Sequence, residues 1–229
     1  MILYLAIPLT LVTYVLAQWV YKKTALAILN PILLCIGALI SIMLAFGLDL
    51  NEYEQGTTIL TRLLEPAVIA LAFPLYQQFV HVKEKIIPVL IACSAGVIVG
   101  LVVTTFVAIS FSASPEIIAS LAPKAVTTPI AMAISHTIGG IPAISAILVI
   151  MVGIFGNVCG PFLLKHSRIR TPEAQGLAMG AGSHVIGTSK AMELSCIHGA
   201  FSTTALLISA VLTSIITPVL YPFLITWMV

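Results

Sequence analysis

A lysine, two threonines and two prolines stand close together in the otherwise apolar stretch LAPKAVTTPIAM, residues 121–132. Lys124 supplies a positive charge, and the hydroxyls of Thr127 and Thr128 supply hydrogen bonds, so the group suits a carboxylate. Thr128 followed by Pro129 is a favourable N-cap and first-turn pair, which predicts that a short helix begins there. Its free amides then favour an anion beside Lys124. The alternative is that Lys124 extends to the membrane surface and the threonines serve only as caps.

A second stretch, GAGSHVIGTSK at residues 180–190, combines several glycines with a serine, a histidine and a threonine. So many glycines disfavour one continuous helix, and Thr188 is placed to cap a half-helix that follows. His184 titrates near neutral pH and is a candidate proton carrier, as is Glu193. The alternative for His184 is a satisfied hydrogen bond inside a helix bundle. We predict one substrate site lined by both stretches: Lys124, Thr127, Thr128, Pro129, Ser183, His184, Gly187 and Thr188.

Two pairs of opposite charges are three residues apart, a spacing that places both members on one helix face. Arg62 and Glu65 are predicted to form a structural ion pair. Lys190 and Glu193 have the same spacing, and mutual neutralisation is the alternative to a proton-carrying role for Glu193.

Motifs of catalysis and metal binding are absent from the sequence. It contains no HExxH, GxSxG, P-loop or dinucleotide-binding pattern. The four cysteines are far apart and lack the spacing of zinc ligands or of a disulfide framework. We therefore expect neither an enzyme nor a bound metal or cofactor.

The composition is that of a membrane protein. Of the 229 residues, 60% are hydrophobic and 8% are charged, whereas about a quarter of the residues in soluble domains are charged. A net charge of +2 does not suggest a nucleic-acid partner. We predict an all-α polytopic protein in the lipid bilayer with about six spanning helices, at Ile2–Val20, Pro31–Leu48, Thr57–Val80, Ile86–Ser110, Ile141–Leu164 and Ala200–Val229.

The charges between these runs orient them, because cytoplasmic loops are enriched in lysine and arginine. Lysines follow the first and third runs, at residues 22–23 and 83–85, whereas acidic residues follow the second run, at residues 49–54. A single crossing by residues 115–140 would then leave Lys165, Arg168 and Arg170 on the outer face. We therefore expect residues 115–140 to dip in from outside and return.

The prolines and glycines support two broken segments. Pro115, Pro123 and Pro129 do not fit one unbroken helix, and residues 171–194 are expected to enter from the cytoplasm in the same way. Broken helices that approach from opposite faces are typical of transporters with inverted repeats. We predict a single domain, 1–229, with possible inverted repeats at 31–110 and 115–229. Two crossing broken helices are the alternative to two re-entrant hairpins.

Several strings of the sequence resemble the LrgB/CidB family. They are PKAVTTPIAMAIS, IGGIPAISAILVIMVGIFG, RIRTPEAQGLAMGAGSHVIGTSKAMEL and GAFSTTALLISAVLTSIITP, with NPILL and LLEPAVIALAFPLYQQ earlier in the chain. The chain departs from the family pattern at His198, where glutamate is common, and at Ser202 and Thr203, where two serines are common.

The resemblance implies two kinds of function. Bacterial members are described as antiholin-like regulators of murein hydrolase activity and lysis that act with a small LrgA/CidA-type membrane protein. A plastid relative is described as a glycolate/glycerate transporter, and some bacterial systems are linked to pyruvate. The resemblance thus implies an LrgA/CidA-like partner and a place in the bacterial cytoplasmic (inner) membrane.

The sequence favours a secondary transporter of small monocarboxylates such as glycolate, glycerate or pyruvate, with possible proton coupling. One ammonium group and two helix N-termini match one carboxylate. The alternative is an antiholin-like regulator of cell lysis. A holin-like role needs a homo-oligomer, for which the small-residue pair Gly96 and Gly100 provides a candidate helix face.

Overall fold

The computed structural model describes residues 2–24, 31–63, 66, 72–77 and 79–228, and these residues form helices joined by turns. Four of the described helices are long and apolar enough to cross a membrane, and one apolar helix is shorter. The prediction of an all-α, multi-pass membrane protein is therefore confirmed. The chain divides into two compact units, Met1–Ala72 and Phe73–Val229, each of which is described by itself.

The first unit is built around two apolar helices that pack against each other. A short helix, α3, begins after Asp49, whose carboxylate accepts a hydrogen bond from the amide of Asn51 at 2.9 Å. The hydroxyls of Thr10 and Tyr53 lie 2.7 Å apart and join this short helix to the first one. The helices of the unit are α1 (Ile2–Thr24), α2 (Pro31–Phe46), α3 (Leu50–Gly56) and α4 (Thr58–Arg62).

The predicted span from Thr57 to Val80 includes residues that the structure does not describe, so its course lies outside the described part of the chain. The same holds for the predicted Arg62–Glu65 ion pair, because Glu65 is one of these residues. Two short helices follow the gap, α6 (Ala72–Gln77) and α7 (Phe79–Glu84).

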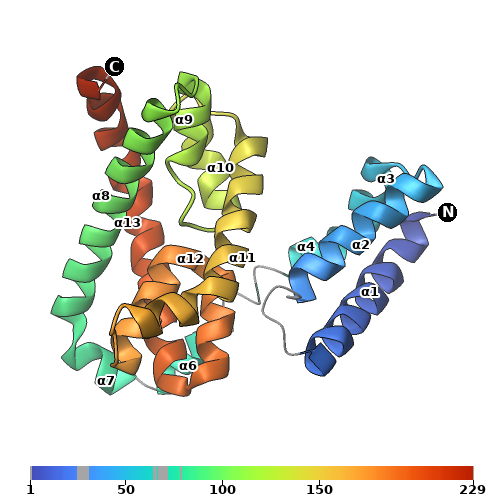
Figure 1. Ribbon diagram of the computed structural model, residues 1–229, viewed down its shortest axis with the longest axis horizontal. Coiled ribbons are helices and arrows are strands. Elements are labelled where there is room, and N and C mark those ends of the chain that lie inside the picture. The colour runs from blue at the N-terminus through green and yellow to red at the C-terminus, as the bar shows by residue number, and fades with distance from the viewer. Residues whose placement is uncertain (1, 25–30, 64–65, 67–71, 78, 229) are drawn as a thin grey trace. The chain divides into compact units, whose positions relative to one another are not determined.

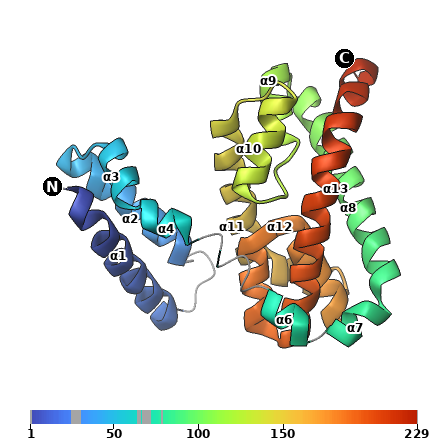
Figure 2. The same ribbon diagram turned by 180° about the vertical axis from the view of Figure 1, so that it is seen from behind.

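The second unit alternates long helices with broken segments, as Figures 1 and 2 show. The long helices are α8 (Ile86–Ser110), α11 (Pro142–His166) and α13 (Cys196–Met228), and each is apolar enough to span a bilayer. The broken segments are α9 (Pro115–Leu121) with α10 (Thr128–Thr137), and α12 (Pro172–Leu194).

The first broken segment is a hairpin. Ile118 on α9 packs with Ala108 and Tyr221, near the ends of α8 and α13. Past the turn, Ala131 packs with residues in the middle of α11 and α13. Ile138, at the end of α10, is again packed against the cluster that contains Tyr221. Because the chain returns to the level at which it started, residues 115–140 do not cross the unit.

The second broken segment is also a hairpin. In its first half, Gly176 and Gly180 lie against the backbone of His198 and Ser202, so this half runs parallel to α13. In its second half the order reverses, since Thr188 contacts Ser202 and Met192 contacts Gly199. The reversal falls at Ser183 and His184, whose backbone angles are not helical. Both broken segments are therefore hairpins and not a pair of crossing broken helices.

The two hairpins start from opposite ends of the unit, as Figures 1 and 2 show for α9 with α10 and for α12. The second hairpin enters from the end that carries Lys83, Lys85, Lys165, Arg168 and Arg170. The first enters from the end that holds Glu116 and has no lysine or arginine in its loops. This separation agrees with the predicted orientation. The repeat boundaries at 31–110 and 115–229 stay a prediction.

Glycines, which have no side chain, allow the second hairpin to pack closely against its neighbours. A Cβ atom at Gly156 on α11 would overlap the side chain of Ser183, and one at Gly153 would lie 2.7 Å from the His184 ring. A Cβ atom at Gly180 would overlap the carbonyl group of Ser202 on α13. Gly182 is different, because a Cβ atom there meets nothing within 4 Å.

Substitution of these glycines gives a direct test of the hairpin. We expect Gly180→Ala to destabilise the protein by about 1–3 kcal/mol, because the methyl group meets backbone atoms that cannot rotate away. Gly182→Ala is the matched control, and we expect it to be neutral or slightly stabilising because alanine favours helix. Thermal unfolding of both variants in detergent is the measurement. Equal stability of the two variants would contradict the packing described here.

Candidate functional site

Lys124 lies in the turn between α9 and α10 and reaches across to α8. Its Nζ atom donates a hydrogen bond to the hydroxyl of Thr104 and lies 3.5 Å from the carbonyl oxygen of Gly100. Gly100 is near the middle of α8 and Thr104 is one turn closer to its end, and the lysine is only partly exposed. The ammonium group therefore sits at the depth of the hairpin turn and not at the end of the helices. The alternative in which Lys124 extends to the membrane surface does not fit this position.

The start of α10 differs by one residue from the prediction. Thr127 is the N-cap residue, since its carbonyl accepts the first helical hydrogen bond, from the amide of Ala131 at 2.9 Å. Thr128 is already helical and Pro129 lies in the first turn, where its missing N–H costs nothing. The Thr127 side chain makes no capping hydrogen bond to the helix. Its hydroxyl therefore does not satisfy the first amides of α10.

The second turn is built on a strained histidine. His184 has a φ of 42°, a left-handed conformation that is uncommon for residues other than glycine. Its Nε2 atom lies 2.8 Å from the carbonyl oxygen of Val149 on α11. A carbonyl oxygen only accepts, so the hydrogen of the neutral ring is on Nε2. The alternative prediction for His184, a satisfied hydrogen bond inside the bundle, is therefore met by this contact. The other ring nitrogen, Nδ1, has a lone pair that can accept a proton.

Val149 connects the turns of the two hairpins. Its side chain packs with Val126 and Ala131 of the first hairpin, while its carbonyl binds His184 of the second. Val149 is completely buried. The two turns that the sequence predicted to share a site thus contact the same residue of α11 from opposite sides of the unit.

Gly187 and Thr188 close the second turn. A Cβ atom at Gly187 would lie 2.5 Å from that of Ser183, so the returning half passes next to the turn only because glycine is there. The hydroxyl of Thr188 donates to the carbonyl of His184 at 2.8 Å and lies 2.9 Å from the Ser202 hydroxyl, which must donate to it in turn. Thr188 is therefore not the N-cap that the sequence predicted, because the helix resumes directly after His184. It fastens the turn to α13.

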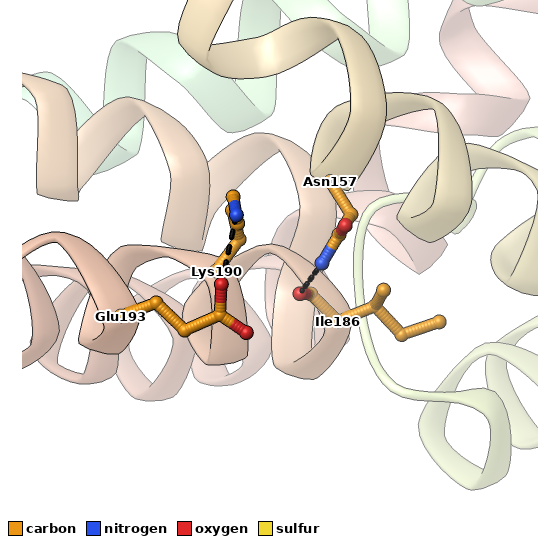
Figure 3. Close-up of polar contacts among 4 residues, drawn as sticks. All are labelled: Asn157, Ile186, Lys190 and Glu193. Carbon is orange, nitrogen blue, oxygen red and sulfur yellow. Dashed lines mark hydrogen bonds and ion pairs between the residues drawn. The ribbon is translucent and has the colours of Figure 1, made fainter. Parts of the chain in front are cut away.

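Glu193 lies away from the turn. It is on the returning half of α12, its side chain is 65% exposed, and its carboxylate is 2.7 Å from Nζ of Lys190. Figure 3 shows this pair together with Asn157 of α11, whose side-chain amide donates to the carbonyl of Ile186 at 3.0 Å. The mutual pairing of Lys190 and Glu193 is thus present. A proton-carrying role for Glu193 stays a prediction without support from its position.

Several polar contacts join parts that sequence reasoning did not connect. The ion pair between Lys85 and Glu173 has a 2.6 Å contact and joins the start of α8 to the start of α12. His198 binds the side chain of Gln175 at 2.9 Å and that of Ser195 at 2.8 Å. Both contacts hold the open end of the second hairpin. The only signal in the sequence is that these polar residues stand at the ends of apolar runs.

A comparable anchor holds the first hairpin. The Ser120 hydroxyl accepts from the amide of Ile141 at 2.7 Å, and the Ser120 carbonyl accepts from the Ser145 hydroxyl at 2.8 Å. Both serines are completely buried. α9 is thereby tied to the start of α11.

The two halves of the predicted site differ in exposure. Ser183, His184 and Thr188 are each 7% exposed or less, whereas Lys124, Thr127 and Thr128 are partly exposed and Pro129 is exposed. A cavity of about 450 Å³ in the second unit is lined by Thr137, Ile138 and residues of α13 between 218 and 226, not by the predicted site residues. A ligand therefore reaches the buried residues of the second turn only if the helices around them move.

Comparison with known proteins settles the family. The model of the LrgB-like family matches residues 10–223, which include both hairpins, α8, α11 and most of α13. The chain belongs to the LrgB-like family. No solved structure matches it.

Relatives of similar length support the same assignment. The uncharacterized protein YwbG of Bacillus subtilis is 33% identical over 216 residues, which is 94% of this chain and 96% of that protein. The holin-like protein CidB of Staphylococcus aureus is 31% identical over 216 residues, 94% of each chain. The uncharacterized protein YxaC of B. subtilis is 33% identical over 212 residues, 93% of this chain and 92% of that protein. The resemblance predicted from the sequence strings is thus confirmed.

The role of Thr188 can be tested by an isosteric substitution. Thr188→Val removes a hydrogen-bond donor to the His184 carbonyl and leaves the Ser202 hydroxyl unpaired. We expect a loss of about 2 kcal/mol of stability, because both groups remain buried. The exposed neighbour Ser189 donates only to the carbonyl of Val185, so Ser189→Ala should change stability by less than about 0.5 kcal/mol. Denaturant unfolding measures the stability of both variants. A Thr188→Val protein as stable as Ser189→Ala would show that the Thr188 hydrogen bonds do not stabilise the turn.

Proposed function

We propose that this LrgB-like membrane protein is a secondary transporter of small monocarboxylates such as glycolate, glycerate or pyruvate. It would act in the bacterial cytoplasmic (inner) membrane by transport and not as an enzyme. The observation that carries the proposal is the position of Lys124, an ammonium group in a hairpin turn that contacts an apolar helix long enough to span a membrane. Charged groups at such depth are costly and are commonly functional.

The arrangement of the unit supports transport over a purely structural role. Discontinuous helices that enter from opposite faces and meet at the same depth are the usual substrate site of secondary transporters. The carboxylate would bind Lys124 and the free amides at the start of α10. Thr127, Thr128 and Ser183 would add hydrogen bonds, and the free ring nitrogen of His184 would carry a coupled proton.

The burial of the second turn is consistent with this proposal. A transporter needs a state in which the substrate is sealed from both faces, and the buried residues Ser183 and His184 would contribute to such a seal. The contacts that would open first are those at the hairpin ends, such as the Lys85–Glu173 pair.

Removal of the charge of Lys124 is the principal test. We expect Lys124→Met to lower uptake of labelled glycolate into proteoliposomes by about 10- to 100-fold, because a charge-assisted hydrogen bond to the carboxylate is lost. Lys165→Met, at the cytoplasmic end of α11, removes a charge outside the turn and should leave uptake unchanged. If the unaltered protein moves no glycolate, glycerate or pyruvate under any imposed gradient, the transport proposal fails.

Ligand-induced stabilisation provides a second and simpler test. We expect millimolar glycolate or pyruvate to raise the melting temperature of the purified protein, because a ligand that binds only the folded state stabilises it. The rise should vanish in Lys124→Met and persist in Lys165→Met. An equal rise in both variants would place the binding elsewhere.

The second candidate is an antiholin-like regulator of murein hydrolase activity and lysis, which the name of the holin-like CidB relatives favours. Such a protein would act with an LrgA/CidA-like small membrane protein and as a homo-oligomer. Gly96 and Gly100 on α8 leave room for a neighbouring helix, since a Cβ atom at either meets nothing within 4 Å. This candidate predicts that lysis phenotypes survive the loss of the Lys124 and His184 side chains.

A further inference from the structure

Five buried side-chain hydroxyls among the described residues have no hydrogen-bond partner, those of Thr105, Ser135, Thr203, Ser209 and Thr217. Two of them, Thr105 on α8 and Thr217 on α13, are completely buried and lie at one level of the second unit. Threonines and serines in helices usually donate to the carbonyl four residues earlier. Thr104 and Ser214, on the same two helices, have this bond. Thr105 is therefore an exception within α8, whereas Thr217 shares its unpartnered state with Thr203 and Ser209 on α13.

The helix register brings the two threonines to one place. α8 and α13 run in the same direction, since Cys93 packs with Ala205 near their starts and Ala108 packs with Tyr221 near their ends. Thr105 is one turn from Leu101 and from Ala108, and Thr217 is one turn before Tyr221. All three of these neighbours belong to one cluster. Thr105 and Thr217 therefore both lie in the seam between α8 and α13, at the same level.

Lys124 reaches the same level of α8. Its ammonium group binds Thr104, the residue next to Thr105. Ala122, two residues before Lys124, packs in the cluster that flanks both orphan threonines. Because adjacent helical residues point about 100° apart, the ammonium group of Lys124 lies on the face of α8 that adjoins the seam, at the level of the two orphan hydroxyls.

We propose that Thr105 and Thr217 form a specificity wall beside Lys124, which binds the hydroxyl or oxo oxygen of a small carboxylic acid whose carboxylate binds the lysine. This inference rests on the proposed transport function and extends it to the choice of substrate. A hydroxyl donates and accepts, so it binds either an alcohol or a ketone oxygen. A plain fatty acid of the same length leaves both threonines unpaired and binds more weakly, because a site built for a polar group discriminates strongly against its absence.

Competition experiments test the wall in proteoliposomes that contain the full-length protein. The quantity measured is the ratio of the concentrations of unlabelled acetate and glycolate that halve the uptake of labelled glycolate. We expect glycolate to compete better than acetate in the unaltered protein. Thr105→Val and Thr217→Val should each lower this ratio by about tenfold, since one hydrogen bond is lost. Competition by acetate itself should not change.

Matched variants separate the wall from general damage to the helices. Ser110→Ala on α8 and Ser214→Ala on α13 remove hydroxyls that are already bound to backbone carbonyls, and they should keep the full ratio. Thr105→Ser and Thr217→Ser retain a hydroxyl and should keep most of it. Melting temperatures of all variants show whether a loss reflects unfolding.

The outcomes distinguish this inference from the function on which it rests. If the unaltered protein takes up no glycolate, both the transport proposal and the specificity role of Thr105 and Thr217 fail. If uptake occurs and both valine variants keep the competition ratio of the unaltered protein, the transport proposal stands. The two hydroxyls then have only a structural role, and the specificity wall is wrong. A loss of the ratio in the serine variants as large as in the valine variants would also overturn the wall.

Discussion

The need to satisfy backbone polar groups at membrane depth governs the second unit. An interrupted helix exposes amides and carbonyls that lipid cannot bind, so irregular backbone there must be enclosed by protein. Around the second turn, Asn157 binds the carbonyl of Ile186, and the hydroxyl of Thr188 binds that of His184. Each unsatisfied buried group would cost about 1–3 kcal/mol. The polar residues of α11 and α12 are therefore as necessary to the fold as the apolar ones.

Close approach is the second requirement, and it explains where the glycines lie. The hairpin α12 fits between α11 and α13 only because Gly153, Gly156 and Gly180 face it or belong to it. Small residues at helix contacts replace the hydrophobic driving force, which is absent between helices in lipid. The same closeness buries Ser183 and His184, so the packing that stabilises the hairpin also buries the second-turn half of the candidate site.

The sequence predicted the broken segments because prolines and glycines interrupt helices by a local mechanism. It favoured re-entrant hairpins, since the positions of Lys165, Arg168 and Arg170 fit a single crossing poorly, but it left two crossing broken helices open as the alternative. It placed two caps wrongly. Two adjacent threonines before Pro129 offer equally good caps, and the chain uses the first. The break in α12 falls at His184 and not at a glycine, because Val149 holds the histidine in a conformation that its own backbone disfavours.

Contacts between distant segments were beyond prediction from one sequence. Lys124 was recognised as a charge in an apolar stretch, but its partner Thr104 could not be identified, because back-bonding threonines are common in membrane helices. The orphan hydroxyls of Thr105 and Thr217 were invisible for the same reason. Their meaning depends on the register of α8 against α13, which only the fold supplies.

The position of Val149 limits how the unit can move. One face of this residue supports the inner turn of a hairpin from one side of the membrane, and its carbonyl restrains the turn of the hairpin from the other side. A shift of α11 that frees one turn must disturb the other. The turns of the two hairpins are therefore mechanically linked through a single residue. In a transporter of the kind proposed, this link would oppose a state that is open to both compartments at once.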